Sequence, residues 1–229
     1  RLDRSSSTDM QDILTMQKSE ANAGFSKFVE ENYRQWITDE DLSMSNNIMK
    51  RLVFPKLNQE MPLVFLLLDN LRYDQWKIIE PLITELYRVE SESIFTSILP
   101  TSTQYSRNAI FAGLLPGDIA KHHPDLWLDD MDEGGKNMHE EALLGHQIDR
   151  ILRKDIRWTY KKISRNHQAR QLEDSALDLL NHDLSVVVYN FIDMLSHART
   201  EMEVLKELAG DERAYRSITL SWFKNSALW

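Results

Sequence analysis

Two predominantly apolar runs, each followed closely by an aspartate, constrain this chain more than any other feature. The first is Pro62-Leu-Val-Phe-Leu-Leu-Leu-Asp69, and the second, from Leu184, runs into Phe191-Ile-Asp193-Met-Leu-Ser-His197. Strands that are apolar on both faces are typical of parallel sheets covered by helices on both sides. The carboxyl ends of such strands meet at one edge of the sheet. We therefore predict an α/β fold in which the two aspartates lie close together.

The chain after Leu63 alternates apolar runs with amphipathic stretches, as expected for strands and helices that follow each other in such a sheet. Strands are predicted at Leu63–Leu68, Ile94–Leu99 and Leu184–Ile192, and helices over Tyr73–Tyr87, Thr103–Leu115, Gln168–Leu180 and most of Thr200–Leu228. The stretch Pro116–Asn137 contains Pro-Gly, His-His-Pro and Gly-Gly, which predicts a long irregular insertion.

The first part of the chain has no strand pattern. Residues 8–54 are rich in helix formers, and Phe25, Phe28 and Trp36 lie near helical spacing, so we expect two or three short helices. These aromatic side chains either pack on the main domain or contact another protein. We divide the chain into a helical segment, residues 1–56, and a main domain, residues 57–229. Because the chain opens at Arg1, we expect a fragment or a processed form.

Composition excludes several classes of function. The net charge of −9 and pI near 5.3 argue against a basic surface for duplex nucleic acid. The absence of cysteine leaves histidine and carboxylate as metal donors. No apolar run approaches the roughly 20 residues of a membrane span, and no signal peptide is visible, so a cytoplasmic protein without a membrane role is expected.

Three groups of residues carry possible chemistry. Asp69 is placed to bind a metal at the sheet edge or, alternatively, to cap the following helix. Asp193 and His197 are four residues apart and would form half of a zinc, manganese or iron site, or else a surface pair. The hydroxyls of Thr101–Thr103 precede a predicted helix, where they would bind phosphate, act as a nucleophile or serve as helix caps.

Other polar residues give weaker signals. One of His122 and His123 could touch a substrate, whereas the remaining histidines lie in polar contexts typical of solvated side chains. The acidic group Asp129, Asp130, Asp132 and Glu133 lacks the spacing of a calcium-binding hand and is interpreted as a solvated turn.

Three longer segments together resemble the PglZ domain of the alkaline phosphatase superfamily. They are Phe65-Leu-Leu-Leu-Asp-Asn-Leu-Arg-Tyr-Asp-Gln-Trp76, Ile98-Leu-Pro-Thr-Ser-Thr-Gln-Tyr-Ser-Arg-Asn-Ala-Ile-Phe-Ala-Gly113 and Phe191-Ile-Asp-Met-Leu-Ser-His197. The resemblance covers about residues 57–229, and the segment before it looks like the linker after a receiver domain. It implies an alkaline-phosphatase-like parallel sheet sandwiched by helices, within a response regulator that contributes to control of type IX secretion.

The resemblance also implies roles for individual residues. Asp69 would bind one metal ion, and Thr103 would be the nucleophile that bridges to it, with Thr101 as the fallback. Asp193 and His197 would hold the second ion, and zinc is the expected metal. Four neighbouring residues could contact phosphate without an assigned role: Asn70, Arg72, Arg107 and Asn108.

The implied reaction is in-line displacement at phosphorus between two metal ions, followed by hydrolysis of the phospho-enzyme. A threonine nucleophile in this superfamily favours nucleotide-like phosphodiesters as substrates. The implied partners are a sensor kinase, acting through a receiver domain not in this chain, a sigma factor or other transcriptional partner, and a second copy in a homodimer.

The sequence departs from the superfamily in one respect. The later Asp-His pair and the further histidine of the superfamily are missing before Trp229, so we expect a domain truncated at its carboxyl end, with the second-half metal ligands absent and little hydrolysis by these 229 residues. The alternative is a catalytically weak or inactive signalling and dimerisation module that acts through protein partners.

Overall fold

The computed structural model describes residues 8–57, 61–128, 137–201 and 211–229. In these residues, three parallel strands form one sheet with the order β1-β3-β2. The strands are β1 (Leu63–Leu68), β2 (Trp158–Ile163) and β3 (Leu184–Tyr189). Leu68 and Ile163 both pair with Tyr189, so the three carboxyl ends lie level along one edge.

The central strand β3 forms the middle of the core. All six of its side chains are buried. Leu184, Val186 and Val188 pack into a large apolar cluster on one side of the sheet, while Val187 and Tyr189 pack into a smaller cluster on the other. Each fully buried side chain of this kind stabilises the fold by about 1.5–3 kcal/mol. This burial explains why the strand is almost entirely apolar, and the hydroxyl of its one small polar residue, Ser185, is satisfied by donating to the carbonyl of Leu179 at 2.8 Å.

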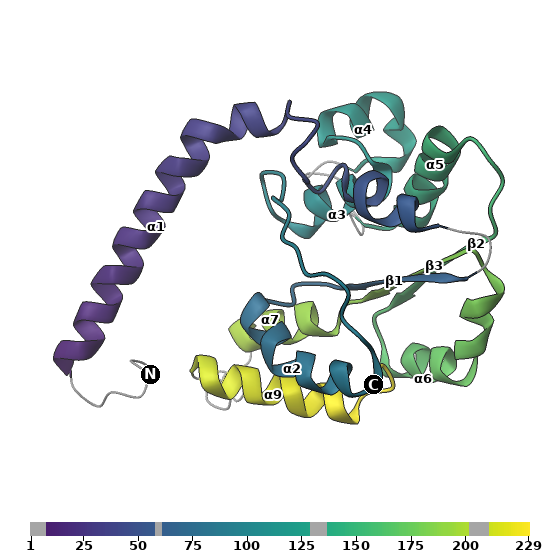
Figure 1. The fold of residues 1–229 in the computed structure, drawn as a ribbon. Helices are drawn as coiled ribbons and strands as arrows, with labels where there is room; N and C mark the ends of the chain where they lie inside the picture. Colours follow the sequence, from purple (N-terminus) through teal and green to yellow (C-terminus); the bar gives the residue numbers. More distant parts are fainter. Residues whose placement is uncertain (1–7, 58–60, 129–136, 202–210) are drawn as a thin grey trace.

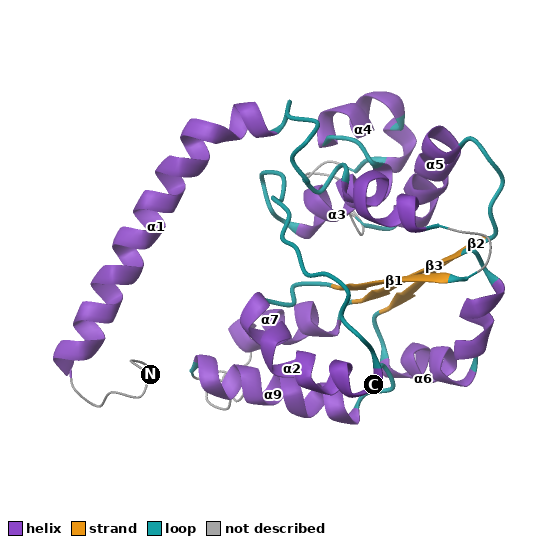
Figure 2. Cartoon of the chain, viewed as in Figure 1, coloured by secondary structure: helices purple, strands orange, loops and turns teal. Residues whose placement is uncertain are grey.

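Helices cover both faces of the sheet (Figures 1 and 2). One layer contains α3 (Thr103–Ala112), α4 (Pro116–His122) and α5 (Glu140–Leu152), and the other contains α2 (Tyr73–Leu86), α6 (Asn166–Asp174), α7 (Phe191–Glu201) and α9 (Glu212–Asn225). Shorter helical turns occur at Met49–Val53, Phe54–Lys56, Pro124–Leu126 and Ala176–Asn181. The predicted α/β architecture is confirmed.

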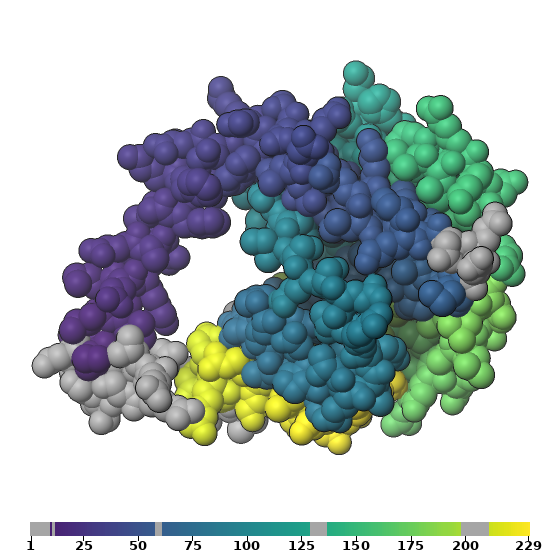
Figure 3. Space-filling view, in the orientation of Figure 1, coloured from purple at the N-terminus to yellow at the C-terminus, as the bar shows by residue number. Residues whose placement is uncertain are grey.

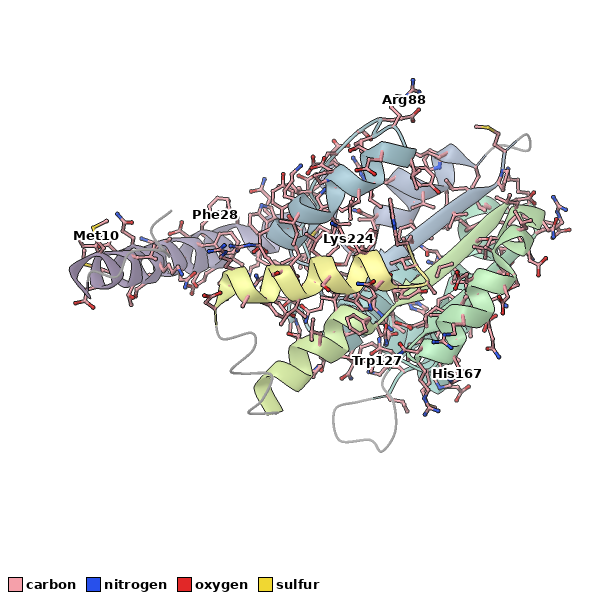
Figure 4. The ribbon with its side chains drawn as sticks, turned by 90° about the horizontal axis from the view of Figure 1, so that it is seen from below. Met10, Phe28, Arg88, Trp127, His167 and Lys224 are labelled. Atoms are coloured by element: carbon pink, nitrogen blue, oxygen red, sulfur yellow. The ribbon has the colours of Figure 1, made fainter. Side chains whose placement is uncertain are left out.

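The first described element is one long helix, α1 (Thr8–Trp36), so the prediction of two or three short helices is wrong. No proline interrupts these 29 residues. The helix stands away from the body of the domain, with Met10 and Phe28 along its free length (Figures 3 and 4). Phe25 and Phe28 are 65% and 51% exposed, whereas Trp36 packs beside buried Met44. Only the end of the helix is therefore anchored on the domain.

The predicted strand at Ile94–Leu99 does not exist. Ile94 is 88% exposed, and Thr96 forms only an isolated parallel bridge with Met44. The third strand is β2, whose sequence carries two consecutive lysines that hide the apolar pattern. The sequence interpretation missed α5 as well. The local apolar run thus failed to predict a strand: Ile98 enters the core beside Met44, but Ile94, Phe95 and Leu99 are exposed.

Several boundaries also differ from the expected ones. Helix α3 ends at Ala112 because Gly113 has φ +62° and a β-carbon there would clash with Gln147. The last strand ends at Tyr189, and α7 begins at Phe191.

The later helices are divided differently from the prediction. The expected helix Gln168–Leu180 divides into α6 and a short 3₁₀ turn, and the expected Thr200–Leu228 helix is represented by the end of α7 and by α9. The insertion Pro116–Asn137 begins as α4, which contradicts an irregular start, while residues 129–136 lie outside the described part. Among the described helices, none is long and apolar enough to cross a membrane.

Candidate functional site

A cavity of about 290 Å³ lies at the carboxyl edge of the sheet. Its lining includes Asp69, Thr103, Asp193 and His197, which are the four residues selected from the sequence. They come from the end of β1, the start of α3 and the first two turns of α7. The structure thus brings together side chains that are up to 128 positions apart in the sequence.

Asp69 sits where β1 leaves the sheet. Its backbone N–H donates to the carbonyl of Tyr189 at 3.0 Å, which continues the ladder with β3. Asn70 then adopts φ +59°, so the chain turns sharply out of the strand. The helix that follows has Arg72 at its N-cap position, so the alternative in which Asp69 caps this helix does not hold. The nearly buried carboxylate instead faces the cavity.

Thr103 is the first residue of α3, and Ser102 occupies the N-cap position without a side-chain capping hydrogen bond. Ser106 closes the turn by donating to the carbonyls of Thr101 and Ser102 at 3.2 and 3.1 Å. Thr101 is exposed and is not part of the cavity lining, whereas Thr103 is. Of the two threonines, Thr103 therefore lines the cavity and Thr101 does not.

Asp193 and His197 lie one turn apart on α7. The Nε2 atom of His197 is 3.6 Å from Oδ1 of Asp193. The Asp193 side chain is partly buried and that of His197 is exposed, and both line the cavity. The i, i+4 spacing in the sequence therefore becomes an adjacent carboxylate and imidazole, because residues four apart share a helix face.

A buried charge network supports the site from below. Arg107 Nη1 donates to Asp69 Oδ2 at 2.6 Å and to Asn190 Oδ1 at 2.9 Å, while its Nη2 donates to Glu140 Oε2 at 2.7 Å. The side chains of Arg107 and Glu140 are only 3% and 1% exposed. Charged hydrogen bonds of this kind are strong and directional. Arg107 thus links the middle of α3 and the start of α5 to the end of β1.

Strand β2 completes this network. Tyr160 donates its hydroxyl to Glu140 Oε2 at 2.7 Å, and Lys162 Nζ lies 2.9 Å from the same oxygen. Lys162 also donates to the carbonyl of Asn137 at 2.7 Å, and the Asn137 amide donates to the carbonyl of Thr103 at 3.1 Å. Lys162 and Asn137 both line the cavity. The site therefore has positive groups as well as carboxylates.

The two carboxylates on Arg107 have opposite pKa shifts. Burial raises the pKa of Asp69, and nearby Asp193 adds to this effect, which outweighs the opposing charge and hydrogen bond of Arg107. Burial would also raise the pKa of Glu140, but the hydrogen bonds and charges of Arg107 and Lys162 outweigh it, so this pKa lies below its ordinary value. Glu140 is thus well neutralised, whereas Asp69 is not.

The family model of the BREX system PglZ alkaline phosphatase-like domain matches residues 48–224, well over half of the chain. The chain belongs to the PglZ family. A second model, the PorX response regulator linker domain, matches residues 1–37. None of the curated proteins searched matches the chain. The PglZ domain is thus preceded here by a linker of the response-regulator type, while a boundary between residues 56 and 57 stays a prediction.

Alkaline phosphatase-like proteins generally bind divalent metals, and the residues of this PglZ domain fit part of such a site. In the described ranges, no group of three or more histidine and acidic side chains is arranged to hold a metal ion. Asp193 and His197 nevertheless form a two-donor pair, and Asp69 and Thr103 offer oxygens in the same cavity. The carboxylates of Asp69 and Asp193 repel each other and give the cavity a local excess of negative charge. A bound cation would reduce this repulsion.

The remaining sequence candidates have other positions. Arg72 binds Asp74 and Glu212 and, like Asn70, is not part of the cavity lining. Asn108 is buried beneath the site and accepts a hydrogen bond from the Asn137 amide at 3.3 Å. The ring of His123 stacks on His146, and neither His122 nor His123 lines the cavity. The acidic group Asp129, Asp130, Asp132 and Glu133 lies outside the described residues.

Sequence reasoning missed Glu140, Lys162 and Asn190. Asn190 could have been found, because it follows β3 directly just as Asp69 follows β1. Glu140 and Lys162 gave no comparable signal. Both lie on elements that were not predicted, α5 and β2, so their meeting with Arg107 could not be foreseen.

Proposed function

We propose that this chain is the metal-dependent phosphodiesterase output domain of a response regulator, with Thr103 as the nucleophile and nucleotide-like phosphodiesters as substrates. One observation carries the proposal: Thr103 begins α3 in a cavity shared by Asp69, Asp193 and His197. A hydroxyl next to carboxylate and imidazole donors suits phosphoryl transfer in the alkaline phosphatase superfamily. Lys162 and Arg107 add fixed positive charge on the same lining.

The chain's own residues would bind and orient the phosphodiester. The first backbone N–H groups of α3 favour an anion beside Thr103. The Thr103 oxygen attacks phosphorus and gives up its proton to water, a P–O bond to the enzyme forms, and the bond to the leaving oxygen, which takes up a proton, breaks. Water then cleaves the nucleotidyl ester of Thr103, which releases the nucleoside monophosphate and restores the hydroxyl. Arg107 is held by Glu140 and Asn190, so its charge stays in place throughout.

Two divalent cations complete this proposal, with zinc preferred for imidazole and carboxylate donors. Asp69 and Thr103 would hold one ion, and Asp193 and His197 would contribute to the other. Bound cations supply the charge that lowers the pKa of the attacking hydroxyl and stabilises the phosphoryl oxygens. Asp69 suits this role because its carboxylate is incompletely neutralised by protein groups.

The linker match supports the regulatory part of the proposal. A receiver domain outside this chain would receive a phosphoryl group from a sensor kinase in the cytoplasm, and α1 would transmit the change to the PglZ domain. The output would contribute to type IX secretion through a sigma factor or another transcriptional partner. The alternative role, a signalling or dimerisation module with weak catalysis or none, is favoured by exposed Phe25 and Phe28 on α1.

The test compares the full-length protein with its Thr103→Ala and Thr101→Ala variants on a dinucleotide with added zinc. Loss of the nucleophile should lower kcat by at least about a hundredfold, whereas the Thr101 variant should resemble the wild type. Turnover retained by Thr103→Ala would contradict the catalytic proposal. Secretion retained by the same variant after loss of hydrolysis would favour the interaction role instead.

A further inference from the structure

A second cavity, of about 490 Å³, lies at the same edge of the sheet. Ile163 and Tyr189, the last residues of β2 and β3, contribute to its lining, together with residues of α6, α7 and α9. Its size falls within the range of small-molecule sites, and this edge is where α/β sheets bind ligands. The reaction proposed at Thr103 does not by itself assign a role to this second cavity.

The two cavities are neighbours. Asn190 and Asp193 line the first cavity, whereas Phe191 and Met194 on the same helical turn line the second. Likewise, Lys162 lines the first and the next residue of β2 lines the second. The two linings have no residue in common, and the beginning of α7 and the end of β2, whose successive side chains point to opposite faces of the sheet, lie between them. A substrate bound at Thr103 would have to extend past these elements to reach the second cavity.

The charge of the second cavity is unusual for this chain. The formal net charge is −9, yet the charged side chains among the described lining residues are two arginines, Arg165 and Arg170. Both are exposed on or next to α6, and neither forms an ion pair with a residue that the structure describes. Glu173 influences the pKa of Tyr189 but is not in the lining. Two uncompensated guanidinium groups favour a phosphate, which they bind in bidentate fashion.

The remaining wall is aromatic and amide-bearing. Phe191 and Trp222 stack with ring centroids 4.1 Å apart and an interplanar angle of 4°. The stacked faces cover each other, but both rings are only partly buried and line the cavity, so aromatic surface of the kind on which nucleobases pack is available there. Asn166 and Asn225 also line the cavity and carry both donors and acceptors that can pair with the edge of a base.

We propose that the second cavity binds a nucleoside monophosphate unit of the substrate, with the base against Trp222 and the phosphate against Arg165 and Arg170. This inference rests on the proposed phosphodiesterase function, because it assigns the unit to the substrate cleaved at Thr103. Binding of the unit itself requires no hydrolysis and is measurable without it. The second cavity would then determine that nucleotide phosphodiesters are preferred to simple ones.

The experiment measures AMP and adenosine binding by calorimetry, using the full-length protein with Thr103→Ala to prevent turnover. We expect AMP to bind, adenosine to bind at least tenfold more weakly, and Arg165→Gln/Arg170→Gln to weaken AMP binding at least tenfold. Trp222→Phe keeps an aromatic ring and should retain most of the affinity, whereas Trp222→Leu should lose it. Arg88→Gln is the matched control, because Arg88 is exposed and far from His167 of α6 (Figure 4).

The outcomes separate this inference from the proposed function. Absence of AMP binding, or equal affinity with and without the two arginines, overturns the second cavity as a nucleotide site even where Thr103 is essential for hydrolysis. Arginine-dependent AMP binding in a protein whose hydrolysis is indifferent to Thr103 supports the cavity and overturns the nucleophile. In the hydrolytic enzyme, the arginine variant should raise KM for a dinucleotide more than for bis(p-nitrophenyl) phosphate.

Discussion

The guanidinium of Arg107 binds the carboxylate of Asp69, with Nη1 2.6 Å from Oδ2. The same guanidinium donates a hydrogen bond to Glu140. The Glu140 carboxylate also accepts a hydrogen bond from the Tyr160 hydroxyl and forms an ion pair with Lys162. Glu140 is therefore the acid that neutralises the arginine, and its pKa is lowered. Asp69 accepts a single hydrogen bond from Arg107. Burial raises the pKa of Asp69, the nearby charge of Asp193 adds to this effect, and Arg107 does not fully offset it. The negative charge of Glu140 is therefore well neutralised, whereas that of Asp69, which lines the cavity, is only partly neutralised.

Glu140→Gln should destabilise the domain by about 3 kcal/mol at pH 7, because removing one member of a buried ion pair leaves the other charges uncompensated. Arg107 would lose its bidentate partner, and Lys162 would lose its counter-ion. Urea denaturation of the full-length protein measures the effect. The neighbouring Glu141→Gln variant, which changes an exposed residue on the same turn, should stay within about 0.5 kcal/mol of wild type. Equal stability of the two variants would contradict the role given to Glu140.

The stabilising effect of Glu140 should also depend on pH. Because its pKa is lower in the folded state than the ordinary 4.5, ionised Glu140 favours folding above that value. This stability is lost as the pH falls from 4.5 through the folded pKa. The difference in unfolding free energy between wild type and Glu140→Gln should therefore narrow in that window. A constant difference from pH 7 down to acid unfolding would show that the charge of Glu140 is unimportant.

Asp69→Asn should have the opposite effect on stability in the presence of a chelator. The raised folded pKa means that ionisation of Asp69 opposes folding once the pH exceeds its ordinary value of 3.8, with the full cost present above the folded pKa. The amide removes that cost, so the variant should be more stable than wild type at pH 7, by about 1 kcal/mol. Chemical denaturation measures the difference. Destabilisation on the scale of Glu140→Gln would mean that the bond to Arg107 outweighs burial.

The strand-end rule explains what the sequence could reveal about this site. It selects Asp69, which lines the cavity, because β1 is apolar up to the residue before it, and the same rule extends to Asn190 after β3. It fails for the run at Ile94, where Ile98 is buried but Ile94, Phe95 and Leu99 are exposed and no strand forms. Strand β2 was missed for the opposite reason. Its Lys162 forms an ion pair with buried Glu140, but in the sequence the lysine makes the strand resemble a polar segment. Long-range ion pairs of this kind have no local signature.

His197→Ala should weaken zinc binding by the full-length protein. Asp193 and His197 are adjacent donors on α7, and imidazole is a preferred ligand of zinc. Loss of a direct ligand should exceed the roughly 10–100-fold loss of affinity that follows changes to the residues around metal ligands. Equilibrium dialysis measures the affinity. His182→Ala is the matched control, because this histidine contacts the carbonyl of Asp178 and is not in the cavity lining. Unchanged zinc affinity in His197→Ala would remove His197 from the proposed metal site.

The long helix α1 should tolerate loss of its aromatic residues without loss of domain stability. Phe25 and Phe28 contact each other and are mostly exposed, and Phe28 also contacts Trp36, which packs against the cluster around Met44. Because an exposed aromatic pair contributes little, Phe25→Ser/Phe28→Ser should change the unfolding free energy by less than about 1 kcal/mol, while Trp36→Ala should cost several times more. If α1 mediates dimerisation, sedimentation will show the double variant as a smaller species than wild type at the same concentration. A double variant that is as destabilised as Trp36→Ala would show that these phenylalanines pack on the domain in solution, and α1 would then lose its free face.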